Sequence, residues 1–259
     1  MKSTKSARLT RRGFLQTIGA AAAGAAVTGS ATDRGAASSA PSESAAAEHQ
    51  WAFVIDLRRC DGCEECTVAC QKTHYLSPGQ TWIKVYRLTG AHGQAYFMPR
   101  LCMHCENAPC VRVCPVAATF KNAEGVVLVD QNTCIGCRTC MAACPYEARY
   151  FNWDPPPPAL NLHEQPMPEF PVPQQQGTVG KCILCVHNAN VGKLPVCVEA
   201  CAMGALYIAD LERDVATNGR ETVKLSRFVR ENDAVRFREE LGTRPRVWYI
   251  GGHGQRLGL

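Results

Sequence analysis

Sixteen cysteines in a chain of 259 residues are the side chains whose chemistry most needs an explanation. They form four groups, with no cysteine left over: Cys60, Cys63, Cys66 and Cys70; Cys102, Cys105, Cys110 and Cys114; Cys134, Cys137, Cys140 and Cys144; and Cys182, Cys185, Cys197 and Cys201. The first and third groups have the spacing C-x2-C-x2-C-x3-C, the second has a middle gap of four residues, and the fourth has a wider one. Cysteines at such short spacings bind iron–sulfur clusters or zinc, or pair as disulfides.

The spacing separates these three uses. A structural zinc site takes its four ligands as two pairs, which does not account for a third cysteine after two residues and a fourth after three more. Four cysteines in so short a segment, repeated along the chain, form a poor disulfide framework, and their share of the sequence lies below that of disulfide-rich scaffolds. We therefore interpret all sixteen cysteines as ligands of iron–sulfur clusters.

Each group is suited to a pair of clusters. Three closely spaced thiolates on a tight loop cap three irons of one [4Fe–4S] cube, and the fourth thiolate then points toward another cluster. Gly62 and Gly136 lie between the first two cysteines of their groups, where we expect a backbone without Cβ to pass close to the cluster. Backbone N–H groups of these loops are expected to donate to sulfur, which helps to set the reduction potential.

Residues 1–47 differ in composition from the rest of the chain. Arg11 and Arg12 precede a weakly apolar run rich in Ala and Gly over residues 17–29, and this pattern resembles a twin-arginine signal peptide. Ala45-Ala46-Ala47 is a plausible cleavage site, and retention of the segment as an uncleaved anchor is an alternative. We expect export to the periplasm by a route that carries folded protein, which suits clusters assembled in the cytoplasm. Most of the net charge of +5 lies in this segment, and the near-neutral remainder gives no sign of nucleic-acid binding.

An internal repeat organises the cysteine-rich part. Residues 54–70 align with residues 128–144 at all four cysteines, at the glycine between the first two, and at Asp56 and Asp130, which follow β-branched runs. Strands are predicted over residues 51–56, 81–88, 126–130, 205–209 and 247–250. A short helix is expected to begin at the fourth cysteine of each group. These elements predict an α+β fold.

We expect three parts in the chain. These are the signal segment and linker over residues 1–47, a cysteine-rich domain over residues 48–213, and a C-terminal tail over residues 214–259 that packs on the core or meets a partner. Inside the domain, the prolines of residues 154–176 exclude a helix or a central strand, so we interpret this insertion as an extended arm or a disordered linker. No later apolar stretch reaches the roughly 20 residues of a membrane span. The mature chain is therefore expected to be soluble or peripheral, and as part of a complex it would be peripheral on the membrane through partner subunits.

Residues 51–210 resemble the four-cluster ferredoxin subunit of the DMSO-reductase superfamily, whose relatives include subunits of DMSO, polysulfide, tetrathionate and formate-linked nitrite-reduction complexes. The resemblance rests on PRLCMHCENAPC at residues 99–110, on residues 134–146, on Arg149-Tyr150-Phe151-Asn152-Trp153, and on PRVWY at residues 245–249. Exported iron–sulfur subunits of sulfate-reducer transmembrane complexes are also similar. The resemblance implies duplicated, loop-rich modules like bacterial ferredoxins, with short strands and helices around four cubane clusters.

The same resemblance implies which cysteines share a cluster. One pair of clusters would be held by Cys60, Cys63, Cys66 and Cys201 and by Cys182, Cys185, Cys197 and Cys70. The other pair would be held by Cys102, Cys105, Cys110 and Cys144 and by Cys134, Cys137, Cys140 and Cys114. Some relatives replace one ligand and hold a [3Fe–4S] cluster, but all sixteen positions are cysteine here, so four [4Fe–4S] clusters are expected.

Cationic side chains beside the ligands are candidates for tuning the clusters. Positive charge there stabilises the reduced cluster, which is more negative, although pairing with a carboxylate or with solvent is an equal alternative for each side chain. The candidates are Arg58, Arg59, Arg100, Arg112 and Arg138. His104 could donate to a sulfur or pack behind the ligands, and is not assigned as a ligand.

The sequence indicates a wire for single electrons rather than an enzyme, because it has no Gly-rich nucleotide loop after a strand, no nucleophile motif and no open metal site. The main hypothesis is a subunit for electron transfer between a periplasmic molybdopterin catalytic subunit and an integral membrane quinol subunit. A second hypothesis has cytochrome c and membrane subunits as the partners, without molybdenum. A third is a free periplasmic polyferredoxin.

Overall fold

The computed structural model describes residues 48–155 and 168–253. The predicted signal segment, over residues 1–47, and residues 156–167 of the proline-rich insertion lie outside the described residues. The described ends of that insertion contain no helix or strand, in agreement with their proline content. In the described ranges, no helix has the length and apolar content to cross a bilayer.

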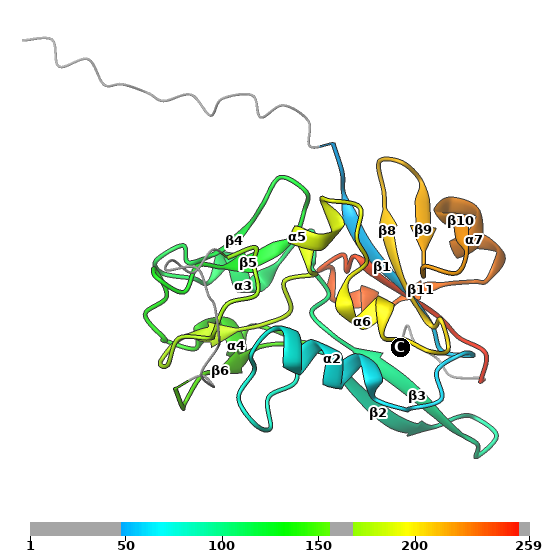
Figure 1. The fold of residues 1–259 in the computed structure, drawn as a ribbon, viewed down its shortest axis with the longest axis horizontal. Helices are drawn as coiled ribbons and strands as arrows, with labels where there is room; N and C mark the ends of the chain where they lie inside the picture. The colour runs from blue at the N-terminus through cyan, green and yellow to red at the C-terminus, as the bar shows by residue number, and fades with distance from the viewer. Residues whose placement is uncertain (1–47, 156–167, 254–259) are drawn as a thin grey trace, which may run out of the picture. The chain divides into compact units, whose positions relative to one another are not determined.

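A six-stranded sheet with the strand order β10-β9-β8-β1-β12-β11 is the largest element of the described domain (Figure 1). Its strand β1 (Trp51–Asp56) pairs antiparallel with β8 (Leu206–Asp210) and parallel with β12 (Val247–Ile250). The other strands are β9 (Val215–Thr217), β10 (Thr222–Lys224) and β11 (Val235–Arg236). The predicted C-terminal tail therefore contributes strands to the same sheet as the start of the cysteine-rich region.

Both faces of this sheet are covered, so all six residues of β1 are buried. Phe53 and Ile55 point to one side, where they join the apolar cluster that contains most of the cysteines. Ala52 and Val54 point to the other side, because successive residues of a strand alternate between faces. There they pack with α7 (Leu225–Glu231), which lies beside β9 and β10 (Figure 1).

Short hairpins and helices carry the cysteine groups. The hairpins are β2 (Lys84–Thr89) with β3 (Ala95–Arg100), β4 (Thr119–Lys121) with β5 (Val127–Val129), and β6 (Tyr150–Phe151) with β7 (Val179–Gly180). The short helices are α2 (Glu65–Thr73), α3 (Pro109–Arg112), α4 (Thr139–Ala142), α5 (Val186–Ala189), α6 (Val196–Glu199) and the 3-10 helix η1 (Glu239–Leu241). This mixture of small helices and strands agrees with the predicted α+β class.

The prediction that a helix begins at each fourth cysteine is wrong. In every group the helix contains the third cysteine, and α3, α4 and α6 end before the fourth one. Proline explains two of these helix starts, because Pro109 opens α3 and Pro195 precedes α6, and its fixed φ suits the first turn. One turn of helix therefore separates the third thiol from the fourth and allows them to reach different places.

The predicted strands agree with the structure best where the strand is buried. The bounds of β1 and β12 are as predicted, and those of β5 and β8 differ by one residue at each end. By contrast, β2 begins three residues later than predicted, because Trp82 and Ile83 bend into the core before strand pairing starts.

Candidate iron–sulfur cluster sites

Three cavities of about 310, 320 and 310 Å³ are each lined by four cysteines. In each cavity, three thiols come from one sequence group and one is the last cysteine of another group. Site I is lined by Cys60, Cys63, Cys66 and Cys201, site II by Cys102, Cys105, Cys110 and Cys144, and site III by Cys134, Cys137, Cys140 and Cys114.

The remaining four cysteines, Cys70, Cys182, Cys185 and Cys197, gather where α2 packs against α6, and we call this group site IV. Burial raises the pKa of Cys70 and of Cys197 well above the usual value, and the charges of the other thiols in the group add to the effect. His74 is buried among them, with Nε2 3.6 Å from Cys185 Sγ and Nδ1 3.7 Å from Cys70 Sγ.

Every fourth cysteine thus lies with three thiols of a different group, in the four combinations that the resemblance implies. Within the described ranges, no three His, Cys, Asp or Glu side chains are close enough together to hold a single metal ion. The thiols stand around cavities instead, as a cube of four irons requires.

The loops of sites I and III share one backbone conformation. Asp56 and Asp130 each accept a hydrogen bond from the backbone N–H two residues further on, at 3.1 and 2.9 Å. After the second cysteine, Glu64 and Arg138 adopt the left-handed conformation, with φ of 60° and 62°, and lead directly into α2 and α4. The repeat in the sequence is therefore a repeat in local structure.

Gly62 and Gly136 have φ of +83° and +67°, a region that glycine adopts without strain. A Cβ on Gly62 would lie 2.4 Å from the Phe97 ring, and a Cβ on Gly136 would lie 2.1 Å from the carbonyl oxygen of Gly177. Close neighbours in the chain itself therefore already require glycine at both positions, and the predicted approach of the backbone to the cluster stays a prediction.

In the fourth cysteine group, backbone N–H groups donate to cysteine sulfur, whereas the predicted donation to cluster sulfur in the loops of the first and third groups stays a prediction. The N–H of Leu184 donates to Cys182 Sγ at 3.3 Å, and the N–H of Ala205 donates to Cys201 Sγ at 3.3 Å. Hydrogen bonds of this kind stabilise negative charge on a ligand sulfur and so raise the reduction potential of a bound cluster.

Most thiols of the four sites are too buried to ionise on their own. Burial raises the pKa of Cys66, Cys105 and Cys182 to about 12 and that of Cys60 and Cys185 to about 11. At neutral pH these groups keep their protons unless a nearby cation compensates the thiolate charge. Iron supplies that charge when a cluster binds, and a donor set made only of sulfur suits iron–sulfur clusters. The residues present therefore fit the cofactor.

Of the arginines beside the ligands, Arg58, Arg59 and Arg138 agree with the predicted pairing with carboxylates or exposure to solvent, and tuning of a cluster stays a prediction. Arg58 pairs with Asp56 at 2.8 Å and Arg59 pairs with Glu221 at 2.7 Å, so their charges are used by carboxylates. Arg138 is exposed, and its guanidinium group lies over the rings of Phe151 and Trp153, 5.1 and 5.0 Å from their centroids.

Two cations that the sequence analysis did not propose as candidates for tuning the clusters are buried near the cysteines, namely Lys181 and Arg149. The one signal in the sequence was position, because Lys181 directly precedes Cys182. His104 is also buried, and its Nδ1 accepts a hydrogen bond from the Val127 N–H at 3.1 Å. The neutral ring therefore carries its proton on Nε2, an atom without a partner among the described residues.

The four sites follow one another in the order I, IV, II, III. Helix α2 carries Cys66 of site I and Cys70 of site IV. Site IV is next to site II, since Cys102 of site II lies close enough to Cys182 of site IV for the two thiol charges to interact. Helix α3 carries Cys110 of site II, and the fourth cysteine of that group, just beyond α3, lines site III.

The two ends of this series are the sites with an exposed cysteine, Cys63 in site I and Cys137 in site III. All cysteines of site IV are buried, and those of site II are buried or half-buried. Ile135 and Trp153, 64% and 63% exposed, lie near the site III end, since Trp153 stacks on Arg138 of the same loop. The arrangement is a row of sites with a buried middle and two accessible ends.

A series of four-cysteine sites on short loops defines a multi-cluster ferredoxin-type protein. Models described as a 4Fe-4S dicluster domain match residues 59–118, 93–156 and 126–202.

Similar proteins include a subunit of the tetrathionate reductase of Salmonella typhimurium, 37% identical over 93% of this chain and 88% of the relative. The putative dimethyl sulfoxide reductase iron–sulfur subunit of Halobacterium salinarum is 37% identical over 78% and 79%. The Hdr-like menaquinol oxidoreductase iron–sulfur subunit 1 of Archaeoglobus fulgidus is 34% identical over 94% and 99%. The chain belongs to this family of iron–sulfur subunits, and it transfers electrons through four [4Fe–4S] clusters.

Proposed function

We propose that this chain is the electron-transfer subunit of a periplasmic oxidoreductase complex, and that it passes single electrons between a quinone-reactive membrane subunit and a molybdopterin catalytic subunit. The observation that carries the proposal is the row of four sites with one exposed cysteine at each end, Cys63 and Cys137. Two accessible ends suit a chain that accepts electrons from one partner and delivers them to another. The reaction on the substrate then belongs to the catalytic partner.

We assign the cofactor ligands by site, each set of four cysteines holding one cluster. When bound, each cluster takes up and releases one electron, and no bond to a substrate forms on this chain. The residues of the chain hold the clusters in a row, keep sites II and IV away from water, and leave sites I and III accessible.

The two ends differ in chemistry, which supports two different partners. The site I loop carries the exposed acidic residues Asp61 and Glu64, whereas the equivalent positions of the site III loop are Ile135 and Arg138. An acidic loop suits a cationic partner surface, because complementary charges speed and orient association. Trp and Arg are frequent among the residues that dominate binding energy, so the stack of Arg138 and Trp153 suits a more apolar partner surface.

The decisive experiment is a mild affinity purification of the chain from its native membranes, with molybdenum, tungsten and haem measured in the recovered complex. Molybdenum or tungsten together with a large subunit is the expected result. A second candidate is a molybdenum-free complex of quinone and cytochrome c subunits, which the similarity to a menaquinol oxidoreductase subunit supports. Haem without molybdenum or tungsten would establish that candidate, and recovery of the chain alone would contradict both.

We also propose that residues 1–47 direct the cluster-loaded protein to the periplasm by the twin-arginine route. Replacing Arg11 and Arg12 by lysine keeps the charge and removes the recognised pair. The expected result is a cluster-containing precursor in the cytoplasm, measured by fractionation of spheroplasts. Lys2→Arg with Lys5→Arg is the matched control, and it should be exported normally. Normal export of the Arg11→Lys, Arg12→Lys variant would exclude this route.

A further inference from the structure

Three buried cations lack a carboxylate partner among the described residues, and two of them, Lys181 and Arg149, lie beside cysteines of the cluster sites. Lys181 and Arg149 are 2% and 5% exposed, and neither forms an ion pair with any carboxylate in the part of the chain that the structure describes. Burying an ion costs free energy unless an opposite charge compensates it. The protein must therefore contain another source of negative charge near these two side chains.

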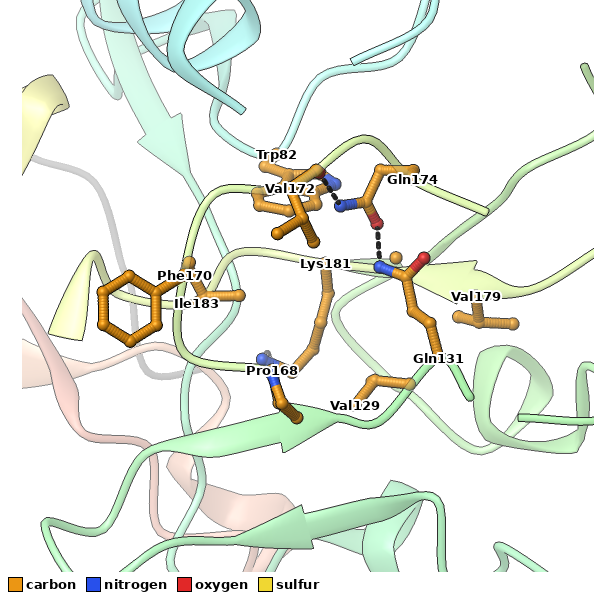
Figure 2. Close-up of a pocket in the computed structure, with 11 residues that line it drawn as sticks. Trp82, Val129, Gln131, Pro168, Phe170, Val172, Gln174, Val179, Lys181 and Ile183 are labelled. Atoms are coloured by element: carbon orange, nitrogen blue, oxygen red, sulfur yellow. Dashed lines mark hydrogen bonds between the residues drawn. The ribbon is translucent and has the colours of Figure 1, made fainter. Parts of the chain in front are cut away.

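Lys181 lies in an uncharged environment. Its Nζ donates to the carbonyl oxygen of Cys182 at 2.6 Å, which is a neutral partner. Figure 2 shows the Lys181 side chain in a pocket with apolar residues such as Phe170 and with Gln131 and Gln174, which hydrogen bond to each other at 2.7 Å. No acidic residue is among those that line this pocket of about 350 Å³.

Arg149 is held in a similar way, directly against site II. Its Nη1 donates to the Thr119 hydroxyl at 3.2 Å, and its Nη2 has no partner among the described residues. The side chain lines the site II cavity. Burial disfavours its charge, yet the nearby sulfurs, those of Cys110 and Cys140 first, raise the pKa of Arg149. The guanidinium group therefore lies in the site II cavity, close to cysteine sulfur.

The loop of site II, which contains His104, lies close to further cationic residues. The Arg246 backbone N–H donates to the Met103 carbonyl oxygen at 2.8 Å, and Lys121 Nζ donates to the Glu106 carbonyl oxygen at 2.7 Å, so two further cationic residues lie along the loop that contains His104. His104 lies between Cys102 and Cys105 in the loop of site II. Positive charge is therefore concentrated around the middle of the row of sites, whereas the site I loop carries exposed acidic residues.

We propose that Lys181 and Arg149 are the counter-charges of the buried clusters and keep the reduction potential of the site II cluster within the range of its neighbours. Each electron added to a cluster increases its negative charge, and a site closed to water stabilises that charge poorly. A fixed cation in a medium of low dielectric constant offsets this effect, and it acts more strongly there than at a solvated end site. Lys181, against Cys182 of site IV, and Arg149, in the site II cavity, thus allow electrons to cross the middle of the wire.

The inference rests on the electron-transfer function proposed above, but its test measures the clusters of this chain and not electron transfer to a partner. The cluster-loaded chain is purified anaerobically in its complex and reduced stepwise, with the clusters followed by electron paramagnetic resonance. The variants are Lys181→Met and Arg149→Met, which remove charge and keep much of the volume. Arg112→Met is the control, because Arg112 lies on α3 beside the same ligands but is exposed.

Each methionine variant is expected to lower the midpoint potential of at least one cluster, and one signal should shift in both. Arg112→Met should leave all midpoints in place, and the charge-keeping variants Lys181→Arg and Arg149→Lys should restore most of the shift. Unchanged midpoints in both methionine variants, at full iron content, would overturn the proposal.

Loss of a cluster is also decisive. A methionine variant that holds about twelve irons instead of about sixteen supports the proposal if the charge-keeping variant recovers the missing cluster, because charge is then what the site requires. If Arg149→Lys and Lys181→Arg lose the same cluster, the two side chains act through their shape and the proposal is wrong. If the midpoint potentials shift as expected but the purified protein contains no partner for electron transfer, the proposed function is contradicted and this inference stands.

Discussion

Replacing Gly136 by alanine should destabilise the protein by more than backbone strain alone. Gly136 has φ of +67°, and a residue with a Cβ is destabilised by about 1–2 kcal/mol in that region. The new Cβ would also lie 2.1 Å from the Gly177 carbonyl oxygen, on a loop held by the hydrogen bond from the Gly177 N–H to the Asn152 carbonyl at 2.8 Å. Overpacking of this kind costs about 1–3 kcal/mol more, so we expect a total of about 2–5 kcal/mol.

Gly79→Ala is the matched control, because Gly79 has φ of +83° and nothing within 4 Å of the added Cβ. It should cost the strain term alone, about 1–2 kcal/mol. For a protein of this size each kcal/mol lowers Tm by about 2–4 °C, so the two variants should differ by roughly 2–12 °C. The assay is anaerobic calorimetry of the cluster-loaded proteins at one scan rate. Equal Tm values for the two variants would refute the argument from the Gly177 contact.

Three further variants test other contacts. Gly62→Ala should lower Tm less than Gly136→Ala, because the Cβ would meet a ring, that of Phe97, which has some freedom to rotate; a larger loss would show that the ring is fixed. Trp153→Ala should leave the iron content unchanged and allow the purified complex to dissociate at lower salt, by size-exclusion chromatography; an unchanged salt profile would remove Trp153 from the interface. Asp210→Asn should lower Tm at pH 7, since hydrogen bonds from His49 and from backbone N–H groups lower the pKa of Asp210 although burial opposes them. The ionised carboxylate contributes stability above the unfolded pKa of about 4, so the Tm difference from the unmodified protein should narrow as the pH falls below about 5, and a constant difference would contradict this.

The cofactor could be predicted from the sequence, but the pairing between groups could not be derived from spacing. Short spacings fix which thiols share a loop, because only a few backbone conformations connect them. The meeting of Cys70 with the fourth group spans more than a hundred residues of sequence, and it depends on the packing of α2 against α6. The resemblance to a known family supplied that pairing, and the fold supplies its physical cause.

Strand prediction succeeded where burial leaves a strong pattern and failed where pairing alone makes the strand. β1 and β12 are apolar runs in the centre of the sheet. β3 contains proline and arginine, and β11 is a two-residue strand, so neither has a pattern that marks it before its partner is known. The sequence also does not show which cation is buried, because Lys181 and an exposed arginine such as Arg112 both lie close to a ligand in the sequence.

The duplicated loops separate what binds the cluster from what faces a partner. Glu64 and Arg138 share a left-handed conformation that side chains rarely adopt, so the path of the backbone has been kept in spite of its strain. A strained backbone persists only when its surroundings require it, and what the two loops have in common is three thiols around one cavity. The exposed side chains of Glu64 and Arg138 carry opposite charges, and binding of a cluster does not require this difference. We therefore expect these exposed positions to select the partner, while the cysteines and their turns are the same at both ends of the wire.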